Sequence, residues 1–185
     1  MPSYGWIIII GILVVIVLWA IATYNSLIKM RNDSEEAFST MDVFLKKRFD
    51  LIPNLVETVK GYAKHESTTL ENVIKARNTG MQATTAEEKI NADNMLTGTL
   101  KTLFALSEAY PELKANTNFI DLQNQLKKIE DEIASSRRYY NAVVKNYNIK
   151  IEVFPSSIIA SLSHFEKKPL YIINEEQREN VKVQF

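Results

Sequence analysis

The chain has 185 residues, of which 46% are hydrophobic and 24% charged, with only 5 glycines and 5 prolines. These values exclude a largely disordered chain and argue against a turn-rich all-β protein. The absence of cysteine excludes disulfides, thiolate metal ligands and cysteine nucleophiles. The 22 basic and 22 acidic side chains balance, so no net field attracts nucleic acid, and we expect no nucleic-acid partner.

The N-terminal part of the chain is apolar and uncharged. No Asp, Glu, Lys or Arg precedes Lys29, and residues 6–22 read WIIIIGILVVIVLWAIA. A helix from Tyr4 to Tyr24 rises about 30 Å, at about 1.5 Å per residue, which matches the hydrocarbon core of a bilayer. We therefore predict an N-terminal tail and transmembrane anchor over residues 1–28, with the lipid bilayer as its partner.

The residues of this span fit an anchor that is not cleaved. The aromatic rings of Trp6, Trp19 and Tyr24 lie near its ends, where such rings favour the headgroup level. Gly11 has no small residue four positions away, so the span alone should dimerise weakly. A cleaved signal peptide is the alternative, because Ala20–Ala22 resembles a cleavage site. However, the chain lacks a basic n-region and its apolar run exceeds the usual 7–15 residues.

The charges after the span predict its orientation. Lys29 and Arg31 follow the apolar run closely, whereas the N-terminal tail carries no basic side chain. The positive-inside rule therefore places the N-terminus outside and the body in the cytoplasm. A second basic cluster, residues 46–48, could contact anionic lipid, but Asp42 and Asp50 stand at spacings that favour pairing within the protein.

The rest of the chain has the apolar spacing of long amphipathic helices. One seam alternates steps of three and four residues and ends before Phe154-Pro155, because proline bars helical geometry in the residue ahead of it. Its positions are Phe119, Leu122, Leu126, Ile129, Ile133, Ser136, Tyr140, Val143 and Tyr147. Asn116 or Asn118 can cap its start.

Upstream, an apolar face from Phe38 to Val59 can continue the membrane helix directly, with Pro53 expected to kink or briefly break it. Residues 68–71 and 85–88 each read as a capping box that opens a further helix. Gly80, within Asn-Thr-Gly, is expected to stop or bend the first of these two helices.

Long amphipathic helices joined by short loops predict an all-α protein, in which an N-terminal transmembrane helix precedes an antiparallel helical bundle. We expect the bundle to span residues 29–154. The C-terminal tail, residues 155–185, holds a short apolar helix and two short extended pieces, and we expect it to pack on the side of the bundle.

Three stretches resemble the LemA family of bacterial membrane-anchored proteins. They are DVFLKKRFDLIPNLVETVKGYAKHE at 42–66, YPELKANTNFIDLQNQL at 110–126, and RRYYNAVVKNYNIKIEVFP at 137–155. The resemblance implies a four-helix bundle behind one transmembrane helix in the bacterial inner membrane. It implies no catalytic residue and no defined ligand. The positions that match the family signature are Asp50, Pro53, Asn54, Glu66, Arg77, Tyr110, Pro111, Arg137, Tyr140, Asn141, Asn148 and Pro155.

The sequence offers little for catalysis. A di-metal carboxylate centre in a bundle requires a Glu-x-x-His pair on each of two helices. The chain has only His65 and His164, and the residues three positions before them are Tyr62 and Ser161. No Gly-x-Ser-x-Gly turn and no glycine-rich phosphate loop is present. We therefore predict no metal, no cofactor and no enzymatic activity.

Polar residues within the apolar seams are the best candidates for a functional layer. A buried Arg48 would need a carboxylate from a facing helix, for which Glu130 and Glu132 are available. Such a layer can fix the register of the helices, or it can act as a switch that relays change between the membrane and the body. The candidate polar-layer and interaction residues are Arg48, Asp50, Asn54, Arg137, Tyr140 and Asn141.

Tyr140-Asn141 and Tyr147-Asn148 are seven residues apart and therefore share one helix face. Core tyrosines whose hydroxyls reach the edge of the bundle account for this pattern. A small-molecule pocket is the alternative.

These observations predict a non-enzymatic, single-pass membrane-anchored scaffold that works through protein–protein or homotypic contacts. A membrane-tethered sensor or adaptor whose bundle binds a ligand is the alternative, and a cryptic enzyme comes third. We expect a homo-oligomer and a further protein partner of unknown identity. The extended pieces at residues 170–173 and 181–183 are the segments expected to pair between copies.

Overall fold

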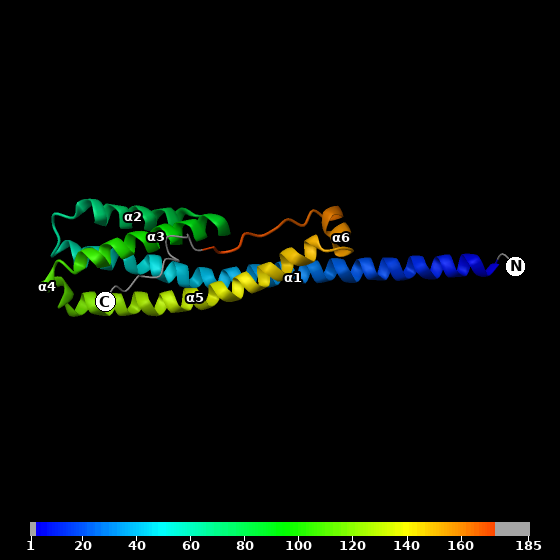
Figure 1. Cartoon of the computed structure of the whole chain (residues 1–185), viewed down its shortest axis with the longest axis horizontal. Coiled ribbons are helices and arrows are strands. Elements are labelled where there is room, and N and C mark those ends of the chain that lie inside the picture. Colours follow the sequence, from blue (N-terminus) through cyan, green and yellow to red (C-terminus); the bar gives the residue numbers. More distant parts are fainter. Residues whose placement is uncertain (1–2, 173–185) are drawn as a thin grey trace, which may run out of the picture. The chain divides into compact units, whose positions relative to one another are not determined.

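The computed structural model describes residues 3–172, and all regular structure within that range is helical (Figure 1). The predictions of an all-α fold, of one long apolar N-terminal helix and of a bundle are confirmed. The helices are α1 (Ser3–Lys60), α2 (Ser67–Gln82), α3 (Ala86–Ser107), α4 (Pro111–Lys114), α5 (Thr117–Glu152) and α6 (Ser156–Leu162).

Helix α1 is continuous over 58 residues and includes Pro53 without a break. Among the described helices it is the one long and apolar enough to cross a membrane, and no residue of its most apolar stretch is buried. By length and composition, its N-terminal part is therefore able to anchor the protein in a bilayer. The expectation that the span continues directly into the following amphipathic helix is confirmed.

The described residues form two compact units, and α1 and α5 each contribute to both. The smaller unit contains residues 3–37 and 139–170, and the larger unit contains residues 38–138 and 171–172.

The larger unit is a bundle of four helical segments, formed by residues 38–60 of α1, by α2, by α3 and by residues 117–138 of α5. Apolar side chains at helical spacing fill its interior, as the seams predict. The ring of Phe104 on α3 meets that of Phe119 on α5 edge to face, with centroids 6.2 Å apart. Buried positions from the segments include Met41, Leu45, Ile52, Leu55, Val73, Leu96, Leu103, Phe119 and Leu126.

The predicted stop at Gly80 is wrong, because α2 runs through this residue and ends at Gln82. A Cβ atom at Gly80 would stand only 2.3 Å from Cζ of Phe49, far inside van der Waals contact. The glycine therefore allows α2 to approach the aromatic ring on α1 closely, rather than ending the helix.

Two of the three predicted helix N-termini are confirmed. Helix α3 opens on a capping box between Thr85 and Glu88, as predicted, and backbone N–H groups that bond the Glu88 carboxylate hold its pKa below the ordinary value. Asn116 caps α5 by accepting the N–H of Phe119 at 3.0 Å. The predicted box at 68–71 is wrong: α2 begins at Ser67, and its N-cap residue, Glu66, makes no side-chain cap bond.

In the smaller unit, α6 folds back onto α1, and Leu27, Tyr147, Ile151 and Ala160 form a common core. The short apolar helix predicted for the tail is thus confirmed. The segment from residue 165 to 172 follows α6 in an extended course without regular structure, so no β-strand forms at residues 170–172. The second predicted extended piece, residues 181–183, lies outside the described residues.

Candidate functional site

A buried polar cluster lies inside the larger unit. Arg48 on α1 donates through Nη1 to Oδ1 of Asp93 on α3 at 2.8 Å, and to Oγ1 of Thr97 at 3.0 Å. Tyr171, from the C-terminal segment, donates its hydroxyl to the other carboxylate oxygen of Asp93. The Arg48 and Asp93 side chains are only 5% and 2% exposed, so both charges depend on these partners.

The acid that pairs with Arg48 is not one of those predicted. Glu130 and Glu132 were expected, but the hydrogen-bonded ion pair forms with Asp93, since α3 faces α1 at this level. Asp93 had a visible signal: it stands between Ile90 and Leu96, three residues after one buried position and three before another. An acid on the apolar face of a helix needs a buried cation.

Nothing in the sequence indicated that Tyr171 is the second hydrogen-bond donor to the Asp93 carboxylate. Tyr171 is separated from Asp93 by 78 residues and stands in an extended segment with no helical period. Burial raises the pKa of the Tyr171 phenol, and the neighbouring Asp93 carboxylate raises it further. The hydroxyl therefore remains a proton donor to Asp93. The guanidinium of Arg137 lies 5.3 Å from the centroid of the Tyr171 ring, at a distance that allows a cation–π contact.

A small polar cavity of about 170 Å³ opens beside this cluster. Helices α1, α3 and α5 and the C-terminal segment contribute its walls. Its charged lining consists of Arg48, Asp93, Lys101, Glu130 and Arg137, three cations against two anions. The guanidinium of Arg48 is also incompletely bonded, because its buried Nε has no hydrogen-bond partner among residues 3–172. A buried donor without an acceptor costs roughly 1–3 kcal/mol, so the Nε group favours a polar atom in the adjoining cavity.

The predicted polar-layer residues do not form one cluster. Arg48 and Arg137 line the same cavity. Asp50 is exposed and pairs with Lys46 at 2.7 Å on the same helix, and Asn54 is exposed on that helix as well. Tyr140 and Asn141 belong to the smaller unit.

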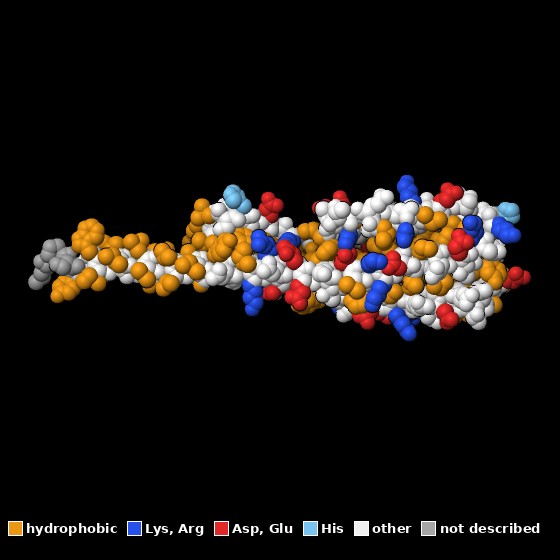
Figure 2. Space-filling model, turned by 180° about the vertical axis from the view of Figure 1, so that it is seen from behind, with side chains coloured by type: hydrophobic (Ala, Val, Ile, Leu, Met, Phe, Trp, Pro, Cys, Tyr) orange, Lys and Arg blue, Asp and Glu red, His pale blue; other side chains and the backbone are white. Residues whose placement is uncertain are grey.

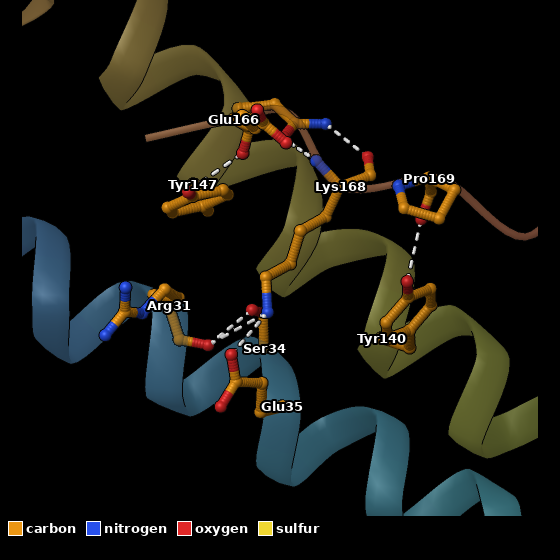
Figure 3. Close-up of polar contacts among 9 residues, drawn as sticks. Arg31, Ser34, Glu35, Tyr140, Tyr147, Glu166, Lys168 and Pro169 are labelled. Carbon is orange, nitrogen blue, oxygen red and sulfur yellow. Dashed lines mark hydrogen bonds and ion pairs between the residues drawn. The ribbon is translucent and has the colours of Figure 1, made fainter. Parts of the chain in front are cut away.

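In the smaller unit, the tyrosine–asparagine face of α5 binds the backbone of the segment that follows α6 (Figure 3). Tyr140 donates its hydroxyl to the carbonyl of Pro169 at 2.7 Å, and Tyr147 donates to that of Glu166 at 2.9 Å. Burial raises the pKa of Tyr140 to about 12, which keeps the hydroxyl protonated as a donor.

Asn148 completes this set with two hydrogen bonds to the main chain of Lys168. It donates to the carbonyl at 2.9 Å and accepts the N–H at 3.0 Å. The Lys168 side chain reaches across to α1, where Nζ lies 3.0 Å from the Glu35 carboxylate (Figure 3). The prediction of core tyrosines is confirmed, since both rings are buried. The seven-residue repeat also holds the extended segment 166–169 in place, which neither core tyrosines nor the alternative of a small-molecule pocket implied.

The anchor residues all lie on the exposed part of α1. Trp6 is 68% exposed, and Gly11 has no heavy atom within 4 Å of a Cβ built on it. Trp19 and Tyr24 are partly exposed, and Phe165 meets the ring of Tyr24 edge to face, with centroids 5.9 Å apart. Within residues 3–172, no three His, Asp or Glu side chains converge as a metal ion would require.

The chain is similar in sequence to proteins of one known family. The LemA family profile matches residues 37–185. Protein LemA of Metamycoplasma hominis is 25% identical over 161 residues, which cover 85% of this chain and 72% of that protein. Magnetosome protein MamQ 2 of Paramagnetospirillum magneticum is 25% identical over 170 residues. That match covers 78% of this chain but only 62% of the magnetosome protein, so the chain spans less than two thirds of this relative.

Proposed function

The chain belongs to the LemA family, and on that basis we propose that it acts as a non-enzymatic, single-pass membrane-anchored scaffold that works through protein–protein or homotypic contacts. The observation that carries the proposal is the continuity of α1. One helix contains both an exposed apolar span and the buried positions Leu27, Met41 and Leu45. A rigid helix of this kind holds every copy in one orientation and raises the effective concentration of the bodies in the membrane plane.

The pairing of the buried charges supports a structural rather than a catalytic use of the polar layer. Arg48 and Tyr171 both donate to the carboxylate of Asp93, so the charge of each buried ion is matched within the layer. A polar layer of this type sets the register between helices, as a single buried polar residue does in coiled coils.

The proposal places the N-terminus outside and the body in the cytoplasm of a bacterial cell. The natural chain has no cysteine, so single cysteines report without background. In intact cells, Ser3→Cys should react with a membrane-impermeant maleimide, and the exposed site Thr68→Cys should react only after lysis. The reverse pattern would overturn the orientation.

The scaffold role is tested by photo-crosslinking in native membranes. A benzophenone amino acid at Val43 or at Ile120, both exposed apolar positions in the larger unit, should give discrete heavier products that contain a second copy or another protein. The same probe at the buried position Leu45 serves as the matched control and should give monomer only. Monomer alone from all three sites would contradict the scaffold.

A second candidate function is the binding of a small anionic or zwitterionic ligand in the polar cavity, as for a membrane-tethered sensor. Its volume of about 170 Å³ suits a molecule of roughly benzene size, and the surplus of one cation favours a carboxylate. Millimolar succinate or glutamate should then raise the melting temperature of the full-length protein, and Lys101→Ala should remove that rise. An unchanged melting temperature with both compounds rejects the candidate.

A further inference from the structure

The turn between α5 and α6 exposes an unusual amount of apolar surface. From Val153 to Ser163 the chain carries no charged side chain. Phe154 and Leu162 are 81% and 74% exposed, and Ile158 between them is about half exposed. A bare aromatic and aliphatic surface of this kind marks a site of interaction with a membrane or a partner. We call this surface, formed by Ile149, Val153, Phe154, Ile158 and Leu162, the apolar tip.

The apolar tip stands next to the end of the membrane span. Leu27, three residues or about 4.5 Å beyond Tyr24, packs against Tyr147 of α5 and Ala160 of α6. Thr23, in the last turn of the span itself, is only 7% exposed. Helix α5 runs back along α1 toward the span (Figure 1), so the residues that follow Ile151 extend to the level of the last turns of the span.

The surface of the smaller unit changes character around the apolar tip. Figure 2 shows the hydrophobic atoms of the span followed by a further gathering of hydrophobic atoms before the first acidic and basic side chains. Charged groups then border the tip. Glu152 pairs with Lys167, and the guanidinium of Arg31 lies 5.6 Å from the centroid of the Phe165 ring. Long basic side chains at such a border can reach lipid headgroups while their stems cover apolar surface.

We propose that the apolar tip is a second membrane contact, which inserts into the interfacial region of the same leaflet that α1 leaves. The inference rests on the proposed anchoring by α1. Its partner is lipid because the tip is continuous with the exposed apolar span, which the proposed anchoring places in hydrocarbon. An uncharged turn with Phe, Ile and Leu on its outer surface has the composition of segments that lie in the interface rather than cross it.

This contact gives the anchor two points of attachment instead of one. A single span can rotate about its own axis and tilt, whereas an inserted tip fixes which side of α1 faces the headgroups. The extended segment held by Tyr140, Tyr147 and Asn148 follows α6 after a short turn, and the membrane contact and that segment are parts of the same smaller unit.

Fluorescence from single-cysteine variants tests the proposal on the full-length chain in phosphatidylcholine and phosphatidylglycerol vesicles. A polarity-sensitive dye is attached at Phe154→Cys and at Leu162→Cys. Both positions are exposed, so the dye does not disturb the core. Val17→Cys in the span is the lipid control, and Ala142→Cys, exposed on α5 about 18 Å along the helix from residue 154, is the aqueous control.

The apolar tip should give a blue-shifted emission that lipids brominated near the headgroup quench at least twofold, and aqueous iodide should quench it several times less than it quenches the Ala142→Cys dye. If Val17→Cys is quenched by brominated lipid while both tip positions behave like Ala142→Cys, the anchor stands and the second contact is wrong. A blue shift at the tip without quenching by brominated lipid would show that a second protein copy covers it, which also overturns the proposal. Failure of quenching at Val17→Cys would instead refute the anchor.

Discussion

Removing the carboxylate of Asp93 should destabilise the larger unit far more than removing an exposed carboxylate from the same bundle. Asp93→Ala leaves the Arg48 guanidinium buried, with the Thr97 hydroxyl as the remaining acceptor of its Nη1. An uncompensated buried charge costs about 3–5 kcal/mol. In a protein of this size, the loss corresponds to a fall of roughly 10 °C in melting temperature.

The matched control is Asp50, whose ion pair with Lys46 has nearly the same length but exposed partners. The Lys46–Asp50 and Arg48–Asp93 distances are 2.7 Å and 2.8 Å, yet the first pair is 64% and 48% exposed. Solvent screens an exposed pair, so Asp50→Ala should change the free energy of unfolding by less than about 1 kcal/mol. Because the two ion pairs have similar lengths, the difference in stability between the two variants measures the effect of burial.

A double variant separates the net contribution of the Arg48–Asp93 ion pair to stability from the penalty of leaving one buried charge unpaired. Replacing both charges, as Arg48→Met with Asp93→Leu, removes the orphaned group and should cost much less than the sum of the two single variants. Circular dichroism at 222 nm during urea unfolding of the full-length protein in mild detergent measures these differences. Both tryptophans lie in the span, so their fluorescence does not report on the bundle. Equal midpoints for Asp93→Ala and Asp50→Ala would refute the reasoning.

Three further changes test the packing and the helix ends. Gly80→Ala should cost about 1–3 kcal/mol, because its Cβ would overlap the Phe49 ring, whereas Gly98→Ala has open space and should stabilise by up to about 1 kcal/mol in the same urea titration. Thr85→Ala should lose about 1 kcal/mol through the cap bond, and an unchanged midpoint would contradict the capping box. Because the pKa of Tyr140 is raised to about 12, its contribution to stability is complete below pH 10 and falls by about 2–3 kcal/mol as the pH rises toward 12. Tyr140→Phe should remove that part of the pH dependence.

Local rules sufficed for much of the fold. The three-and-four spacing from Phe119 to Tyr147 predicted the buried face of α5, because a helix that must cover a core repeats its apolar residues with that period. The capping box at Thr85 and Glu88 was also predictable, because its hydrogen bonds join residues that are only three positions apart in the sequence. Gly80 was misread because the effect of a glycine depends on what faces it, and the Phe49 ring comes from a different helix.

The polar cluster was harder to predict because its contacts are distant in sequence. Arg48 could be identified as a charge in an apolar seam, but its partner depends on which helix faces α1, and no local pattern determines that. Tyr171 contributes from an extended segment with neither helical nor strand periodicity. The role of Tyr140 and Tyr147 in holding residues 166–169 was missed for the same reason, since their acceptors are backbone carbonyls without a sequence signature.

Alkaline carbonate extraction of native membranes, followed by the intact mass of the retained protein, tests most directly whether α1 anchors the chain. Full-length protein should stay in the membrane pellet and keep residues 4–24, while a variant that lacks residues 1–28 should move largely to the supernatant. Release of the full-length protein by carbonate, or a retained chain that begins near Thr23, would contradict the anchor and the scaffold function built on it.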